Sequence, residues 1–130
     1  MRVAVTRVKP LYPSKAPFHP SEKYPEMDFP VLTGSDNFVY GGVREIFRLL
    51  GYDAKHYGTK DWNPLGEVIK PGDTVLVKPN LVFSRSRDIE ATVTHPSVVR
   101  AVVDYTLKAV GPTGKVIVAD APQYLSLIHI

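Results

Sequence analysis

The sequence of 130 residues contains no cysteine. The chain therefore holds neither a disulfide bond nor a cysteine-ligated zinc or iron-sulfur site of its own. It also lacks any apolar run close to the roughly 20 residues that a membrane-spanning helix needs, and its first residues are too few and too polar for a signal peptide. We expect a cytoplasmic protein that does not enter a membrane.

Sequence motifs of several large enzyme classes are also missing. There is no phosphate loop ending in Gly-Lys-Ser/Thr, no Gly-x-Gly-x-x-Gly after the first apolar segment, no Gly-x-Ser-x-Gly and no His-Glu-x-x-His. The four histidines do not have the spacing of a metal site, so we predict no metal centre. A net charge of +3, from 16 basic and 13 acidic residues, favours an anionic ligand slightly. It falls short of the clustered charge of a nucleic-acid binder, so no nucleic-acid partner is expected.

Proline is concentrated near the start of the chain. Six of the 12 prolines lie between residues 10 and 30. Each ring removes a backbone donor and restricts the residue before it, so this spacing rules out a helix or a central strand. We therefore predict an extended arm over residues 9–34. Its aromatic residues favour an arm packed on its own domain over a partner-binding tail.

The remaining first half of the chain predicts short elements. Residues 2–8 alternate valine with polar residues, which indicates a strand. Asp36 is placed to cap a helix that runs to Leu50. Because Gly41 and Gly42 weaken this helix, either it starts later or another backbone approaches closely there. Residues 52–57 predict a second, weaker strand, and a helical turn follows at residues 63–69.

The second half predicts a strand, a helix and a strand. Residues 74–77 are a short apolar run, as expected of a strand buried on both faces of a parallel sheet. Pro96 suits the first position of a helix, which Gly111 and Pro112 end. Residues 115–119 form a second apolar run. This βαβ unit predicts parallel strands with a right-handed crossover, so the fold class is α/β with a partial open parallel sheet.

Polar residues follow both predicted strands. In an open parallel sheet, ligands bind beyond the carboxyl ends of the strands, where loops and helix N-termini meet. The residues expected at this edge are Lys78, Asn80, Thr94, His95 and Asp120. The connection over residues 81–93 is longer than usual between strand and helix, which is typical of a binding loop or lid.

Each of these residues has a functional and a plain structural interpretation. Lys78 either binds a phosphate or carboxylate or marks the exit of a strand into water. Asp120 binds a metal, a hydroxyl or a lysine, or it starts a turn. Asn80 contacts a ligand or closes a turn, the latter being favoured. His95 is a general acid or base, or more often a cap or packing residue, and Thr94 could equally be the cap.

Four segments together resemble a known family, the domain of unknown function 362 (DUF362). They are NPLG at residues 63–66, IKPGDTVLVKPNLV at 69–82, THPSVVRAV at 94–102 and ADAPQ at 119–123. The similarity runs in order from about residue 36 to residue 123. It implies a bacterial or archaeal cytoplasmic protein whose complete domain is longer than this chain, so that the sheet is left incomplete at one edge.

The resemblance also bears on cofactors and partners. Some relatives carry ferredoxin-like iron-sulfur modules further along, and others occur among polysaccharide-biosynthesis genes, but the family's reaction is not established. It implies that residues 1–124 are the N-terminal part of such a domain, with no cofactor encoded in them and an iron-sulfur cluster only in a downstream part. Residues 125–130, LSLIHI, match one reading frame of a transposon-end sequencing adapter, so we expect them not to be native.

Two hypotheses of function follow. In the first, the chain is part of an enzyme that binds an anionic small molecule: Lys78 and the helix N-terminus hold the anionic group, Asp120 binds a metal or hydroxyl, and His95 moves a proton. In the second, it is a non-catalytic module that docks an electron-transfer or polysaccharide-biosynthesis partner through the arm.

Overall fold

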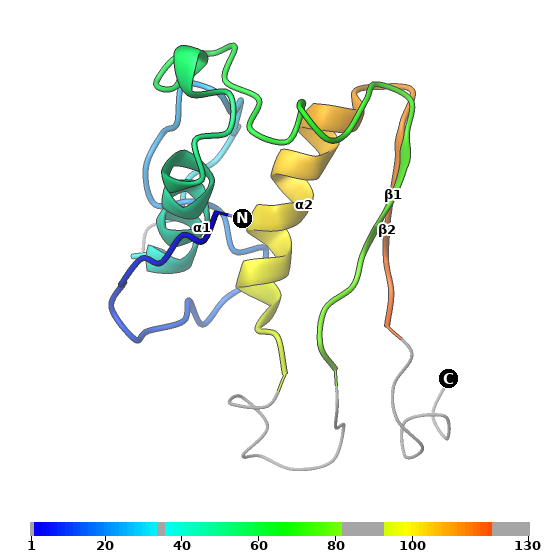
Figure 1. Cartoon of the computed structure of the whole chain (residues 1–130). Coiled ribbons are helices and arrows are strands. Elements are labelled where there is room, and N and C mark those ends of the chain that lie inside the picture. The colour runs from blue at the N-terminus through cyan, green and yellow to red at the C-terminus, as the bar shows by residue number, and fades with distance from the viewer. Residues whose placement is uncertain (1, 34–35, 82–92, 121–130) are drawn as a thin grey trace.

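The computed structural model describes residues 2–33, 36–81 and 93–120. In chain order the elements are helix α1 (Phe38–Leu49), the short 3-10 helix η1 (Ala54–His56), strand β1 (Thr74–Val77), helix α2 (Pro96–Val110) and strand β2 (Lys115–Val118). Helix α2 lies between α1 on one side and the two strands on the other (Figure 1). The predicted α/β class with a partial open sheet is confirmed.

The βαβ unit has the predicted parallel strands. Thr74 of β1 lies opposite Lys115 of β2, and the register continues to Val77 and Val118. The expectation that β1 is buried on both faces is wrong, because Leu76 stays 60% exposed. Helix α2 covers one face of the sheet, and no other described element packs against the opposite face.

Helix α2 begins and ends as its sequence predicts. Pro96 occupies its first turn, where a missing backbone donor costs nothing, and Gly111 caps its end with a positive φ of 65°. Its N-cap is His95, not Thr94. In the part of the chain that the structure describes, neither helix is long and apolar enough to span a membrane.

Helix α1 differs from the prediction at its start. Its N-cap is Asn37 instead of Asp36, and the Asn37 carboxamide oxygen accepts a hydrogen bond from the Tyr40 amide. Both Gly41 and Gly42 lie inside the helix. A Cβ on Gly42 would lie 2.9 Å from Val8 Cγ1, and one on Gly41 would lie 3.2 Å from a tyrosine hydroxyl. The close approach is therefore made by side chains and not by another backbone.

Two predicted strands do not form. Residues 2–8 are not a strand, and Val3 and Val5 are 75% and 81% exposed because no described strand lies beside them. Residues 52–57 contain η1 and turns instead. Asp53 breaks the extended conformation with a φ of 47°, which its hydrogen bonds stabilise: its N–H donates to Glu67 Oε1, and its own Oδ2 accepts from Asn63 N–H.

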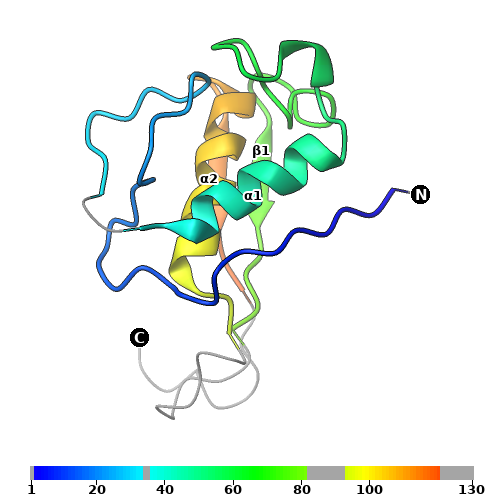
Figure 2. The ribbon, with the colours of Figure 1, turned by 90° about the vertical axis from the view of Figure 1, so that its left-hand side faces the viewer.

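The proline-rich arm packs on its own domain, as favoured from the sequence. It runs along the helical side of the molecule (Figure 2) and buries Tyr24 and Glu26 there. The Tyr24 ring stacks on Tyr40, with ring centres 5.7 Å apart. The arm thus contributes directly to the hydrophobic core, whose buried members are Tyr24, Tyr40, Trp62, Ala101 and Tyr105.

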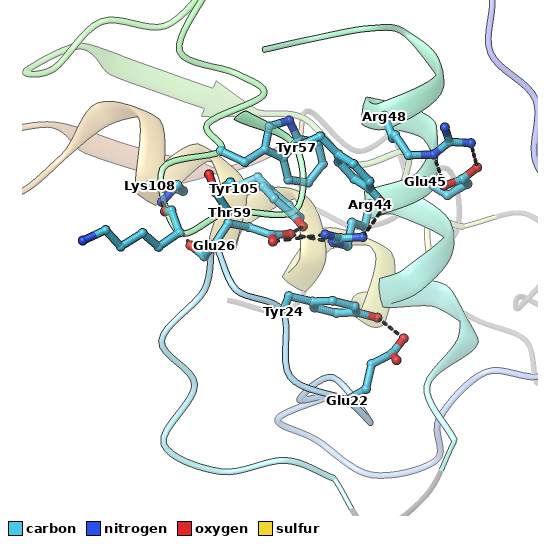
Figure 3. A network of polar contacts seen from close by, with 12 residues as sticks. Glu22, Tyr24, Glu26, Arg44, Glu45, Arg48, Tyr57, Thr59, Tyr105 and Lys108 are labelled. Carbon is cyan, nitrogen blue, oxygen red and sulfur yellow. Dashed lines mark hydrogen bonds and ion pairs between the residues drawn. The ribbon is translucent and has the colours of Figure 1, made fainter. Parts of the chain in front are cut away.

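Glu26 joins the arm to both helices (Figure 3). Its fully buried carboxylate forms an ion pair with Arg44 Nε of α1, at 2.6 Å, and accepts a hydrogen bond from the Tyr105 hydroxyl of α2, at 2.8 Å. The Lys108 ammonium donates to the Glu26 carbonyl. The Arg44 guanidinium also lies over the Trp62 ring, 5.1 Å from its centre. This network satisfies a carboxylate that would be very unfavourable in the core without a partner.

Candidate functional site

The predicted polar edge exists beyond the carboxyl ends of β1 and β2. Lys78 directly follows β1, and Asp120 comes two residues after β2. Because the strands are parallel, both residues leave the sheet at the same edge, which also holds the start of α2 (Figure 1). Lys78 Nζ lies 2.5 Å from Asp120 Oδ1, so the two side chains form an ion pair across the strands.

Asp120 acts as a structural anchor in this arrangement. Its side chain is only 5% exposed. Oδ1 contacts Lys78, while Oδ2 accepts a hydrogen bond of 2.9 Å from the Leu81 N–H. The strand pairing extends to the residue before it, since the Ala119 N–H donates to the Val77 carbonyl. Both carboxylate oxygens are thus engaged in fixing Lys78 and the chain that leaves β1. The structure shows the lysine partner that was one of the alternatives for Asp120, and a metal or hydroxyl ligand stays a prediction.

Lys78 is held in place yet remains accessible. Its side chain is 62% exposed, although its ammonium group contacts the buried Asp120 carboxylate. An ammonium group has three N–H donors, and the ion pair uses one of them. A fixed, solvent-facing cation of this kind is able to bind an incoming anion without first being ordered.

Asn80 and Thr94 connect the end of β1 to the start of α2. The Asn80 N–H donates to Thr94 Oγ1 at 2.9 Å, and the Thr94 N–H donates to the Asn80 carbonyl at 2.8 Å. Leu81 and Val93 continue this pairing as an antiparallel bridge. These hydrogen bonds involve the main chain of Asn80, and through them Thr94 connects the two elements instead of capping the helix.

His95 caps α2 and packs against the arm. Its Nδ1 accepts the Ser97 N–H at 3.2 Å and also contacts Ser97 Oγ at 2.8 Å. A backbone N–H can only donate, so Nδ1 has the free electron pair and the proton of the neutral ring is on Nε2. The ring stacks on Tyr12 and meets the edge of Phe18. The structure thus shows the cap and packing contacts of His95, and its role as a general acid or base stays a prediction.

The N-terminus of α2 does not offer its first amides to a ligand. Pro96 has no N–H, the Ser97 N–H donates to the His95 ring, and the Val98 N–H donates to the His95 carbonyl. The helix therefore contributes its macrodipole to the edge, an effect that favours an anion over short distances, in place of direct hydrogen bonds.

The structure brings all five predicted residues to one edge, through the Lys78–Asp120 pair and the Asn80–Thr94–His95 connection. Sequence reasoning missed the Leu81 amide, because main-chain donors carry no sequence signal. It noted Tyr12 and Phe18 as arm aromatics but did not place them on His95. Four charged residues of the predicted binding loop lie outside the described residues: Arg85, Arg87, Asp88 and Glu90.

The fold and this edge define a partial α/β domain with a parallel sheet and a polar carboxyl-end edge. The family model described as Domain of unknown function (DUF362) matches residues 75–128. This match supports a DUF362 domain-containing protein, in agreement with the resemblance seen in the sequence. The match starts in β1 and includes α2, β2 and all five edge residues. Searches of curated proteins and of solved structures returned no significant match.

The family match does not test two of the sequence-based predictions. The matched range includes residues 125–128, so the adapter origin of residues 125–130 stays a prediction, and these residues lie outside the described part of the chain. The chain has no cysteine, and across the described ranges no three His, Asp or Glu residues are grouped as metal ligands. An iron-sulfur cluster in a downstream part remains a prediction from the family resemblance.

Proposed function

We propose that this chain binds an anionic small molecule, through a phosphate or carboxylate group, at the carboxyl ends of β1 and β2. The observation that carries the proposal is the Lys78–Asp120 pair, in which a buried carboxylate fixes an ammonium group that is itself 62% exposed. An ammonium held at a strand end, beside the positive end of the α2 dipole, attracts a negative group with little loss of side-chain entropy.

Each edge residue has a defined task in this proposal. Lys78 binds the anionic group, and Asp120 is a positioning residue that orients Lys78 and the Leu81 amide. Asn80 and Thr94 fix the distance between the strand end and α2. The His95 ring is oriented by the cap at the start of α2. Proton transfer by His95 would require the Nδ1 contact with Ser97 to open.

The test is the affinity of the 130-residue chain for inorganic phosphate and for succinate, measured by calorimetry at low ionic strength. We expect Lys78→Ala to lower these affinities by at least roughly tenfold, as for the loss of one charge-assisted contact. Lys115→Ala is the matched control, because Lys115 is an exposed lysine at the opposite end of the same strand pair. Equal affinities for wild type and Lys78→Ala would refute the anion site.

Asp120→Asn separates positioning from charge. The asparagine keeps a side-chain oxygen able to accept the Leu81 N–H but removes the charge that fixes Lys78. If Asp120 only positions Lys78, the Lys78 side chain of the variant must become ordered when phosphate binds. Phosphate affinity should then fall, but by less than in Lys78→Ala. If Asp120 competes with the ligand for the ammonium group, Asp120→Asn strengthens binding, and its positioning role is wrong.

The second candidate is a non-catalytic module that docks a protein partner. The observation that favours this candidate is a surface other than the arm. The arm contributes Tyr24 to the core, so we place this docking surface elsewhere. The uncovered face of the sheet instead exposes Leu76 beside Ile117, at 60% and 38%. If an electron-transfer partner such as a ferredoxin docks there, it broadens the amide signals of β1 and β2, and Leu76→Lys abolishes the effect. Unchanged signals would contradict this module.

A further inference from the structure

A cavity adjoins the anion edge on the side of the arm. It has a volume of about 430 Å³ and is lined by the arm from Pro10 to Ser14, by Phe18 and by His95. This volume lies within the range of about 300–1,000 Å³ that is usual for small-molecule sites. The cavity and the anion edge meet at the Thr94–His95 step, because Thr94 binds Asn80 while the neighbouring His95 lines the cavity. Both features lie at the same end of α2.

The lining of this cavity is aromatic and ordered. The Tyr12 ring stacks on the His95 ring with centres 4.2 Å apart and planes within 10° of each other. Phe18 meets the same His95 ring edge-on, at 5.6 Å and 67°. Although it is stacked, Tyr12 remains 46% exposed, so part of its surface is available to another molecule. Offset stacking of this kind is the geometry that planar rings prefer.

Hydrogen bonds fix the His95 ring and the backbone of Phe18 before any ligand is present. The Ser97 N–H holds the His95 ring through Nδ1. Phe18 has a positive φ of 58°, which is rare for a bulky residue, and its carbonyl accepts a hydrogen bond from Asn37 Nδ2 at 3.1 Å. Asn37 is itself anchored as the cap of α1. The aromatic wall is thus tied to both helices, which reduces the ordering needed on binding.

We propose that this cavity binds a planar aromatic or heteroaromatic group of the same anionic ligand whose charged group contacts Lys78. The inference rests on the proposed function and narrows it to a class of ligand: a planar ring joined to a phosphate or carboxylate. Tyr12 extends the stack onto the planar ring, and Lys78 binds the anion. Pro10 and Pro13 form apolar walls that restrict the conformations of the arm around the ring.

Four probes separate the two parts of the site: inorganic phosphate, ribose 5-phosphate, adenosine and adenosine monophosphate. We expect the monophosphate to bind the 130-residue chain at least roughly tenfold more tightly than ribose 5-phosphate, since stacking on an aromatic side chain has this magnitude. Tyr12→Ala should remove that advantage and leave phosphate affinity unchanged. Tyr12→Phe should retain it, because the phenylalanine keeps the ring.

Adenosine distinguishes failure of this inference from failure of the proposed function. It carries the ring without the charge, so its binding should depend on Tyr12 and not on Lys78. Val31→Ala, at an exposed arm position outside the lining of this cavity, is the control and should bind every probe like wild type. Equal affinities for ribose 5-phosphate and adenosine monophosphate would overturn the ring site while the anion site stands. Tyr12-dependent binding of adenosine without any binding of phosphate would overturn the anion site, and only a site for an uncharged ring would stand.

Discussion

The two sides of helix α2 differ in how completely they are covered. On the side of α1 and the arm, Tyr40, Trp62 and Tyr105 are fully buried. On the other side, the sheet has one uncovered face, where Leu76 is 60% exposed. The comparison indicates that stability comes mainly from the aromatic core under the arm, and that the sheet serves to place polar residues at an accessible edge.

The same difference applies to the charged groups. The Glu26–Arg44 pair is 0% and 14% exposed, whereas the Lys78–Asp120 pair leaves its lysine 62% exposed. Removing one partner from a buried pair leaves an uncompensated charge in a low-dielectric environment, but an exposed ammonium keeps its hydration. We therefore assign the first pair to the fold, whereas the second is the pair that we propose for ligand binding.

The largest expected effect concerns the core itself. Trp62→Ala should lower the free energy of unfolding by about 3–5 kcal/mol, because a fully buried aromatic side chain leaves a cavity. Leu76→Ala, on the uncovered face, should change it by no more than about 0.5 kcal/mol. Urea unfolding of both variants checks the comparison. Similar losses for the two variants would mean that the sheet face is covered in solution.

The buried ion pair provides the next test. Glu26→Gln should lower the free energy of unfolding by up to about 5 kcal/mol. It leaves Arg44 without its counter-charge and weakens the hydrogen bond from the Tyr105 hydroxyl. The double variant with Arg44→Met should recover part of this loss. Asp28→Asn, an exposed arm carboxylate, is the matched control. A loss below about 1 kcal/mol for Glu26→Gln, measured by chemical unfolding, would contradict the role of Glu26 as the link between arm and helices.

Alkaline pH should act on the buried side selectively. Burial raises the pKa of Tyr24, Tyr40 and Tyr105 above the usual value of about 10, and the neighbouring carboxylates of Glu22, Asp104 and Glu26 add to this. Because the folded pKa values exceed the unfolded ones, stability is full below about pH 10 and is lost as the pH rises further. An ultraviolet titration should find these three tyrosines protonated until the chain unfolds. Their ionisation at about pH 10 in the folded chain would contradict their burial.

The smallest expected effect is at acid pH and concerns the turn before η1. Desolvation acts to raise the pKa of Asp53, but hydrogen bonds from the Asn63 N–H and from His56 outweigh it and the pKa is lowered. The carboxylate therefore contributes stability above its unfolded pKa of about 4, and this contribution is lost as the pH falls through the folded value. In the Asp53→Asn variant, the free energy of unfolding should therefore change less with pH in the acid range than it does in wild type. An unchanged pH dependence would mean that other contacts hold the strained turn.

The βαβ unit was predictable because its signals are local. Apolar runs, Pro96 and Gly111 mark the elements, and the rule for parallel strands then places Lys78 and Asp120 at one edge. The Glu26 network was not predictable, because its partners are distant in sequence: Arg44 lies 18 residues away and Tyr105 lies 79 away. The strand expected at residues 2–8 does not form, since alternation alone does not supply a neighbouring strand.

Residue type alone does not decide the local structure at two positions. Thr94 is a better cap by residue type than His95, but its hydroxyl oxygen is used by the Asn80 N–H, and the ring of His95 takes over the cap. At Asp53 a polar residue adopts a left-handed conformation that a strand prediction does not include. In both cases a longer-range hydrogen bond outweighs the local preference.

Chemical-shift mapping of the wild-type chain with inorganic phosphate tests the central claim most directly. We predict that phosphate shifts the amide signals of Lys78, Leu81 and Asp120 in a saturable manner and leaves those of Lys115 and the Glu26 network unchanged. Shifts spread over all lysines, or confined to residues away from the ends of β1 and β2, would contradict a ligand site at this edge.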